Sequence, residues 1–138
     1  MTLENLRAFP GALLLALLLS SCAGGPPATE DGAPAKKSPV VGELLAFFPG
    51  FFVHGMGHRY AGNHEKANEI LAMELYSLLP IGLGGILYGI GRSEDAEAVE
   101  IAGLVGMGIG AIPFLGTWIY DLVFTPSEVN RYNSRLPP

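Results

Sequence analysis

Three apolar stretches dominate the second half of this chain. They cover residues 40–56 (VVGELLAFFPGFFVHGM), 70–91 (ILAMELYSLLPIGLGGILYGIG) and 101–120 (IAGLVGMGIGAIPFLGTWIY). An α-helix rises about 1.5 Å per residue, so the second and third stretches each reach about 30 Å, which is the thickness of the hydrocarbon core of a membrane. The pattern therefore predicts at least two membrane-crossing helices.

The first stretch leaves the number of crossings open. Residues 40–56 are shorter than the other two stretches and contain Glu43 and Pro49, but they also contain four phenylalanines. A segment of this length and composition either crosses a locally thinned bilayer or lies at the membrane–water interface. Three crossings, or two crossings plus an interfacial segment, are both compatible with it.

Charged residues around the two long stretches bear on their orientation. The loop at 92–100 (RSEDAEAVE) has one arginine and four acids, whereas the outer flanks carry the basic residues Arg59, Lys66, Arg131 and Arg135. The positive-inside rule therefore places the flanks in the cytoplasm and the acidic loop outside.

The N-terminus has the form of an export signal. A single Arg7 precedes the apolar run GALLLALLL (11–19), which is followed by LSSC (19–22). The serines directly before the cysteine resemble the lipobox of bacterial lipoproteins, and this resemblance implies that residues 1–21 are removed and that Cys22 is lipidated. An ordinary signal peptide or an uncleaved anchor is the alternative, although the apolar run is short for a crossing.

Residues 22–39 separate this signal from the apolar body. They are rich in Pro, Gly and Ala and have too few apolar side chains to form a core. We therefore expect a lipidated Cys22 on a flexible linker, followed by a membrane-embedded domain at 40–138. Since Cys22 is the single cysteine of the chain, an intramolecular disulfide is excluded.

Composition narrows the classes of function. Hydrophobic residues make up 49% of the chain and charged residues 15%, and the net charge is −5. A nucleic-acid-binding protein needs a basic patch, and no block of Lys or Arg is present. Membrane lipid, a second copy of the chain or another membrane protein are the partners to expect.

Glycine spacing suggests how the helices pack. Gly85 and Gly89, and likewise Gly106 and Gly110, form G-x-x-x-G patterns, which allow helix backbones to approach closely in lipid. A capping-box pattern, TPSE at 125–128, predicts a short amphipathic helix that starts near Pro126.

Two motifs in the body resemble the TM2 domain and related small bacterial membrane proteins. The stretch GMGHRYAGN resembles the glycine-rich turn of that family, and GTWIYDLV resembles the end of its later apolar segment. The matching residues are Gly57, His58, Arg59, Tyr60, Gly62, Trp118 and Asp121. One aromatic of the turn is missing, and an extra apolar segment separates the halves. The resemblance implies a small helical membrane protein and no particular reaction.

All three histidines of the chain, His54, His58 and His64, lie within eleven residues. Three imidazoles are a possible zinc site, but the glutamate of H-E-x-x-H is absent, and the intervening glycines make a continuous helix doubtful. The alternative is a turn at the membrane boundary. Glu74 and Asp121 are the other candidates, because an acid within a membrane helix is often functional; otherwise they lie near the interface.

These patterns together predict an all-α protein, a small membrane helical bundle of two to three apolar helices with a short C-terminal amphipathic helix. We expect a bacterial lipoprotein of the inner rather than the outer membrane that acts as a structural or interaction module, without catalytic activity or cofactor. One alternative is a metal-binding or hydrolytic site on the three histidines. The other is a lipid-tethered soluble domain in which 70–91 and 101–120 form a buried core.

Overall fold

The computed structural model describes residues 34–137, and the proposed signal peptide and Cys22 lie outside this range. The described part consists of four helices, α2 (Pro39–Phe47), α3 (Met56–Tyr60), α4 (His64–Ser93) and α5 (Glu97–Asn133). The all-α class is confirmed, with two long apolar helices as its main elements.

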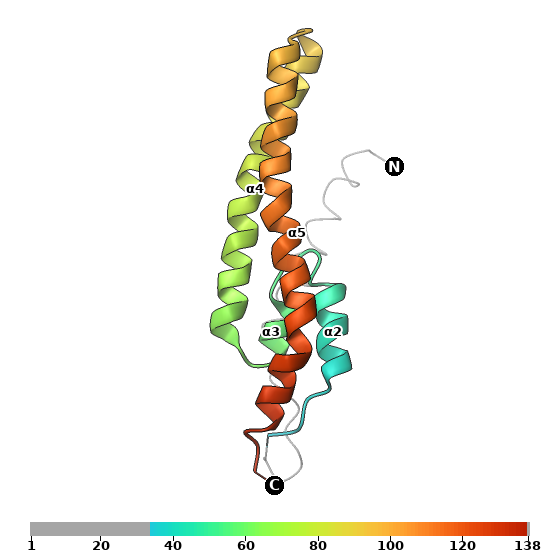
Figure 1. Ribbon diagram of the computed structural model, residues 1–138, viewed down its shortest axis with the longest axis vertical. Coiled ribbons are helices and arrows are strands. Elements are labelled where there is room, and N and C mark those ends of the chain that lie inside the picture. Colours follow the sequence, from blue (N-terminus) through green and yellow to red (C-terminus); the bar gives the residue numbers. More distant parts are fainter. Residues whose placement is uncertain (1–33, 138) are drawn as a thin grey trace, which may run out of the picture. The chain divides into compact units, whose positions relative to one another are not determined.

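Helices α4 and α5 form an antiparallel hairpin of 30 and 37 residues (Figure 1). Both are long and apolar enough to cross a membrane. Glycines let them approach each other closely. A Cβ atom at Gly84 would lie 2.6 Å from the carbonyl oxygen of Gly103, and one at Gly103 would lie 2.7 Å from that of Gly84. Real Cβ atoms do not approach backbone atoms so closely, so the two backbones are in direct contact here.

The G-x-x-x-G patterns mark only part of this contact. Gly110 packs against α4, since a Cβ there would lie 2.5 Å from the carbonyl oxygen of Ser77, and Gly106 makes a looser approach. Gly85 and Gly89 do not contribute to the packing of α4 against α5. A Cβ at Gly89 would meet nothing within 4 Å, and one at Gly85 would only reach a sulfur atom at 4.0 Å. Of the adjacent pair Gly84 and Gly85, it is Gly84 that faces α5.

Residues 40–56 do not form a third long helix. Helix α2 begins with Pro39 in its first turn, where the missing N–H costs nothing, and ends at Phe47. Its nine residues rise only about 14 Å, which is too short for a helix to cross a membrane. Helix α2 packs beside the C-terminal half of α5, and the five-residue α3 lies against α2, α4 and α5 (Figure 1).

One local expectation about α5 is corrected. The short C-terminal helix is not separate, because α5 continues through Pro126 to Asn133. Thr125 and Val129, on either side of this proline, are both fully buried. Their packing supports the helix across a residue that lacks a backbone donor, as tertiary contacts often do in membrane helices.

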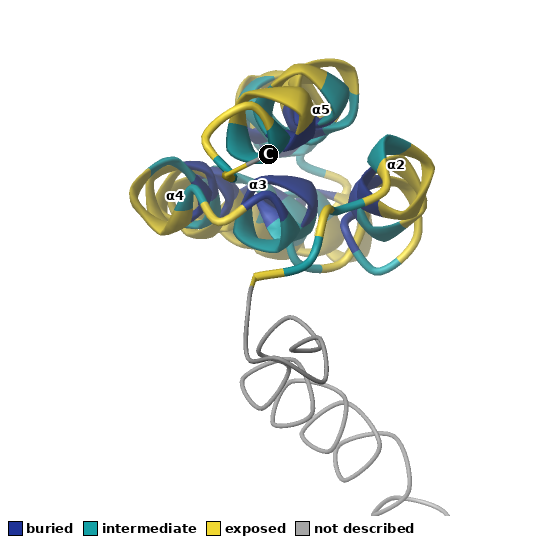
Figure 2. Cartoon of the chain, turned by 90° about the horizontal axis from the view of Figure 1, so that it is seen from below, coloured by how far each residue is buried: buried dark blue, intermediate teal, exposed yellow. Residues whose placement is uncertain are grey.

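The polarity of the described residues is inverted relative to a water-soluble domain. Figure 2 shows buried residues on the inward-facing sides of the helices and exposed residues outside. The largest fully buried side chains are His54, His58, Val129, Thr125 and Asp121, whereas most of the Leu, Ile and Phe side chains are exposed. Only 22% of the most apolar window of α4 and 11% of that of α5 are buried within the chain.

Candidate functional site

The buried polar residues gather where α3 meets α5, and the carboxylate of Asp121 is their centre. Its Oδ2 accepts hydrogen bonds from the backbone N–H groups of Gly55 and Gly57, at 3.0 and 3.1 Å. Its Oδ1 accepts from the backbone N–H of His58 at 3.1 Å and from the ring nitrogen Nδ1 of the same residue at 2.6 Å. Both side chains are almost completely buried, and the carboxylate is surrounded by hydrogen-bond donors from α3 and its N-cap.

Asp121 acts as the N-cap of α3 from a distant part of the sequence. The local N-cap, Gly55, has no side chain, so the first N–H groups of α3 would otherwise lack acceptors. A carboxylate at a helix N-terminus also interacts favourably with the helix dipole. This single residue therefore attaches the α3 turn to the long apolar helix α5.

Glycine is required at both positions that approach the carboxylate. Gly55 has φ +87°, and a Cβ there would lie 2.6 Å from the carbonyl oxygen of Ala67. At Gly57 a Cβ would lie 2.8 Å from the side chain of Ala46 and would clash with Thr125. The segment Gly-Met-Gly-His is thus explained by the need to bring three N–H groups to one carboxylate.

A second buried group surrounds His54. Its backbone N–H donates to Oε2 of Glu74 at 2.8 Å, and its Nδ1 lies 2.8 Å from the hydroxyl oxygen of Thr117. That hydroxyl also lies within donating distance of the carbonyl oxygens of Pro113 and Phe114, which favours Nδ1 of His54 as the donor in their contact. The other ring nitrogen, Nε2, is buried and has no hydrogen-bond partner among the described residues.

The environment of His54 favours a neutral ring. Burial lowers the pKa of His54, although the charge of Asp121 and the carbonyl group of Phe51 act in the opposite direction. Protonation would place an N–H at Nε2 where the described chain provides no acceptor. The backbone N–H of His54 donates to Glu74, so the carboxylate of Glu74 is a structural acceptor that holds the turn before α3 against α4.

Acidification is expected to destabilise the protein through His54. Since its folded-state pKa is lowered, the unfolded chain binds more protons below about pH 6.5. The free energy of unfolding should therefore fall as the pH decreases below that value, by at most about 1.4 kcal/mol per pH unit from this one group. Denaturation at several pH values between 7.5 and 5.5 measures the slope of the free energy of unfolding against pH. His54→Asn should flatten it, whereas His64→Gln, at an exposed position, should leave it unchanged; equal slopes in all three proteins would contradict the assignment.

The remaining motif residues fix the surroundings of the Asp121 group. The side chain of Arg59 donates to Asn68, and the hydroxyl of Tyr60 accepts from the backbone N–H of Ser38. Gly62 turns the chain into α4 with φ +86°. The indole N–H of Trp118 donates to the carbonyl oxygen of Ala46 at 3.1 Å and so attaches α2 to α5. The structure thus brings Gly57, His58 and Asp121 together and distributes the others over the contacts among α2, α3, α4 and α5.

The three histidines do not form one ligand set. Nδ1 of His54 and of His58 contact Thr117 and Asp121 respectively, while His64 is exposed at the start of α4. Among residues 34–137 no group of three His, Cys, Asp or Glu side chains is arranged to hold a metal ion.

Sequence reasoning identified Asp121 and His58 but missed two threonines. Thr117 and Thr125 precede and follow Asp121 by four residues, so the three side chains lie on one face of α5. Thr125 donates to the carbonyl oxygen of Asp121 at 2.6 Å and Thr117 supports His54. The signal was present as T-x-x-x-D-x-x-x-T, a polar face within an otherwise apolar helix.

Comparisons of this chain with models of protein families, with curated proteins and with solved structures find no match. The similarity to the TM2 domain therefore depends on its motif residues alone.

Proposed function

We propose that the protein is an integral membrane lipoprotein of the bacterial inner membrane that acts as a non-catalytic structural or interaction module. The observation that carries this proposal is the inverted polarity of the α4–α5 hairpin, whose outer surface is formed by Leu, Ile, Val and Phe side chains. A surface of this kind is stable when lipid or other membrane helices cover it.

The use of the polar groups supports a structural role. The carboxylate of Glu74 accepts a backbone N–H of the turn between α2 and α3, and that of Asp121 accepts backbone N–H groups of α3 and its N-cap. These bonds leave the groups engaged in holding the fold, whereas a catalytic acid or base has to reach a substrate. The α3 turn and α2 thus form a small platform fixed to one end of the hairpin.

Contacts between the two ends of the described chain bear on topology. The backbone N–H of Lys37 donates to the side chain of Asn133 at 2.8 Å, and the side-chain amide of Asn133 donates to the carbonyl oxygen of Lys37 at 2.8 Å. Residue 37 and the end of α5 therefore lie on the same side of any membrane that the hairpin crosses. If export places Cys22 outside, the C-terminus is outside as well.

We expect a C-terminal alkaline phosphatase fusion to be active and a C-terminal green fluorescent protein fusion to be dark. The N-terminal signal is expected to determine the orientation, although the distribution of basic residues argues for the reverse. Cys22→Ser is the companion variant and should abolish labelling with a radioactive fatty acid. A fluorescent C-terminal fusion would contradict export of residue 22 and with it the lipoprotein assignment.

Extraction with alkaline carbonate tests whether the body itself is integral. Residues 23–138 are placed behind a signal peptide that is cleaved without lipidation, so that no acyl chain retains the protein. We expect it to remain in the membrane pellet, because two apolar helices anchor it. Release into the supernatant would contradict the proposal and favour a lipid-tethered soluble domain, whose apolar faces would then have to be covered by self-association.

A further inference from the structure

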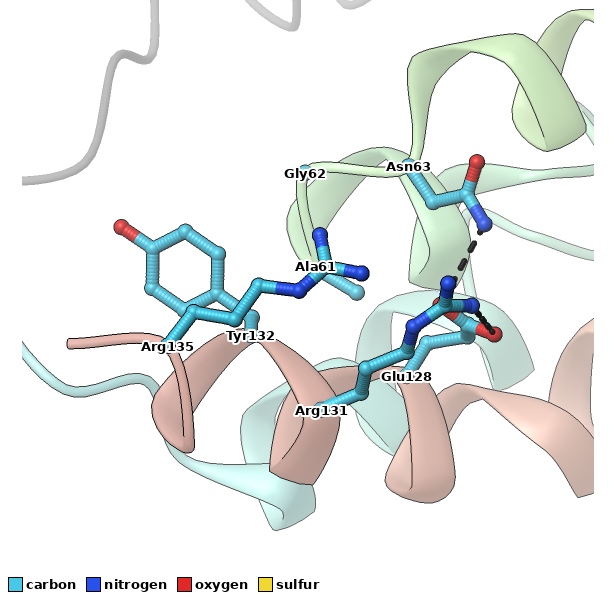
Figure 3. A pocket seen from close by; sticks show the side chains of 7 residues that line it. All are labelled: Ala61, Gly62, Asn63, Glu128, Arg131, Tyr132 and Arg135. Atoms are coloured by element: carbon cyan, nitrogen blue, oxygen red, sulfur yellow. Dashed lines mark hydrogen bonds and ion pairs between the residues drawn. The ribbon is translucent and has the colours of Figure 1, made fainter.

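A polar cavity lies at the end of the hairpin that carries the α3 turn. Its volume is about 160 Å³, and it is formed by the turn between α3 and α4 and by the last turns of α5 (Figure 3). Its lining residues are Ala61, Gly62, Asn63, Glu128, Arg131, Tyr132 and Arg135. None of them takes part in the Asp121 or His54 groups described above.

Positive charge predominates around this cavity. Arg131 lines it from the last turn of α5 and Arg135 from the turn that follows this helix, and Arg135 has no carboxylate partner among the described residues. A third cation is adjacent, because the ammonium group of Lys37 lies 3.9 Å from the centre of the Tyr132 ring and donates to the carbonyl oxygen of Tyr60. Glu128 is the one acidic residue in the lining.

Glu128 occupies the position that an external anion would take. Its Oε2 accepts from the side-chain amide of Asn63 at 3.2 Å, and its Oε1 lies 3.6 Å from a guanidinium nitrogen of Arg131 (Figure 3). A separation of 3.6 Å is too long for a good charge-assisted hydrogen bond, so Arg131 keeps most of its donor capacity. The cavity therefore has two guanidinium groups and an amide directed toward one small volume, with a single weak internal partner.

We propose that this cavity binds a phosphate group through Arg131 and Arg135. Guanidinium groups bind phosphate oxygens in bidentate geometry, and the amide of Asn63 provides a further donor. The adjoining N-terminus of α4 contributes the positive end of a helix dipole, but its first-turn acid Glu65 and the negative C-terminal end of α5 beside the cavity offset this effect, so the two guanidinium groups carry the binding. The phosphate comes either from a phospholipid headgroup or from a soluble phosphate ester.

Native mass spectrometry of the full-length protein in detergent tests the proposal. The probes are phosphatidylglycerol, soluble glycerol phosphate, and a glycolipid with the same acyl chains but without phosphate. We expect one phosphate-bearing probe to bind with a stoichiometry of one and the glycolipid not to compete. Binding of phosphatidylglycerol alone identifies a lipid headgroup as the source, and equal binding of glycerol phosphate identifies a soluble ester. Absence of binding by both would overturn the proposal.

Variants that are expected to change phosphate binding in opposite directions make the test specific. Arg131→Gln combined with Arg135→Gln should weaken binding by at least about tenfold, because two charge-assisted contacts are lost. Glu128→Gln should strengthen binding, since it removes the competing carboxylate. Arg92→Gln, at the opposite end of the hairpin, removes an exposed arginine that faces Glu100 at 3.6 Å and should leave binding unchanged. Equal loss in the Arg92 variant, or weaker binding in the Glu128 variant, would overturn the assignment.

Phosphate binding and membrane integration are separate properties of the protein, and the two experiments test them independently. Carbonate extraction reports on α4 and α5 as membrane helices, whereas binding of glycerol phosphate in detergent requires only the cavity.

Discussion

Asp121→Asn is expected to lower the free energy of unfolding by about 3–5 kcal/mol, the usual effect of removing one partner from a buried charged group. The carboxylate has two oxygens, and each accepts two hydrogen bonds from α3 and its N-cap. In an asparagine one of these oxygens becomes an NH₂ group, so in either orientation of the amide this group faces at least one backbone N–H of α3 or its N-cap, donor against donor. Buried donors without an acceptor are costly, and no water reaches a side chain that is fully buried.

Fluorescence of the single tryptophan measures this effect. Trp118 donates to Ala46 and contacts Phe51, with ring centres 5.2 Å apart, so its emission reports whether α2 and the following turn are attached to α5. Titration of the detergent-solubilised protein with dodecyl sulfate should show the Asp121→Asn variant releasing the tryptophan at a much lower denaturant fraction than the wild type.

Asp95→Asn provides the matched control for this prediction. It makes the same chemical change at an exposed acid in the α4–α5 loop, where φ is +49° and asparagine is well tolerated. We expect its titration curve to overlay that of the wild type. If the two variants behaved alike, the capping role of Asp121 would be wrong.

The sequence was sufficient to predict the hairpin because its signals are local. Length and apolarity identify α4 and α5, and both depend only on neighbouring residues. The boundaries were less predictable. Ser93, which is followed by Glu94 and Asp95, has the N-cap signature of a helix start, but it is the last residue of α4, where its hydroxyl donates to the carbonyl oxygen of Ile90. Pro126 likewise has the signature of a helix start, but buried packing on both sides continues α5 through it.

The candidate site was harder to predict because its contacts are long-range. Asp121 and His58 were identified from motif positions, but their partnership joins residues 63 positions apart. Spacing along the chain cannot show that the carboxylate caps α3, nor that Glu74 accepts the N–H of His54. The same limit applies to the glycines. Gly84 and Gly85 are adjacent and are the same residue type. Only the rotation of α4 about its axis determines which of them faces α5.

Gly84→Ala is expected to lower the free energy of unfolding by about 2–3 kcal/mol, which lies at the upper end of the usual cost of overpacking. Its new methyl group would lie 2.5 Å from the backbone nitrogen of Met107 and 2.6 Å from the carbonyl oxygen of Gly103. Backbone atoms cannot move aside as the end of a flexible side chain can, so α4 and α5 have to separate. The resistance of the detergent-solubilised protein to heating, followed as the soluble fraction after brief incubation, measures the change.

Gly89→Ala separates this steric effect from the intrinsic preference of alanine for helices. It introduces the same methyl group into the same helix, but at a position where a Cβ meets nothing within 4 Å. Alanine favours a helix over glycine by roughly 0.5–1 kcal/mol, so the heat resistance of this variant should be unchanged or slightly raised. A loss at Gly89 equal to that at Gly84 would mean that the outward face of α4 is also packed against a protein surface. Because the described chain leaves that face open, the packing partner would then have to be a second copy or another membrane protein.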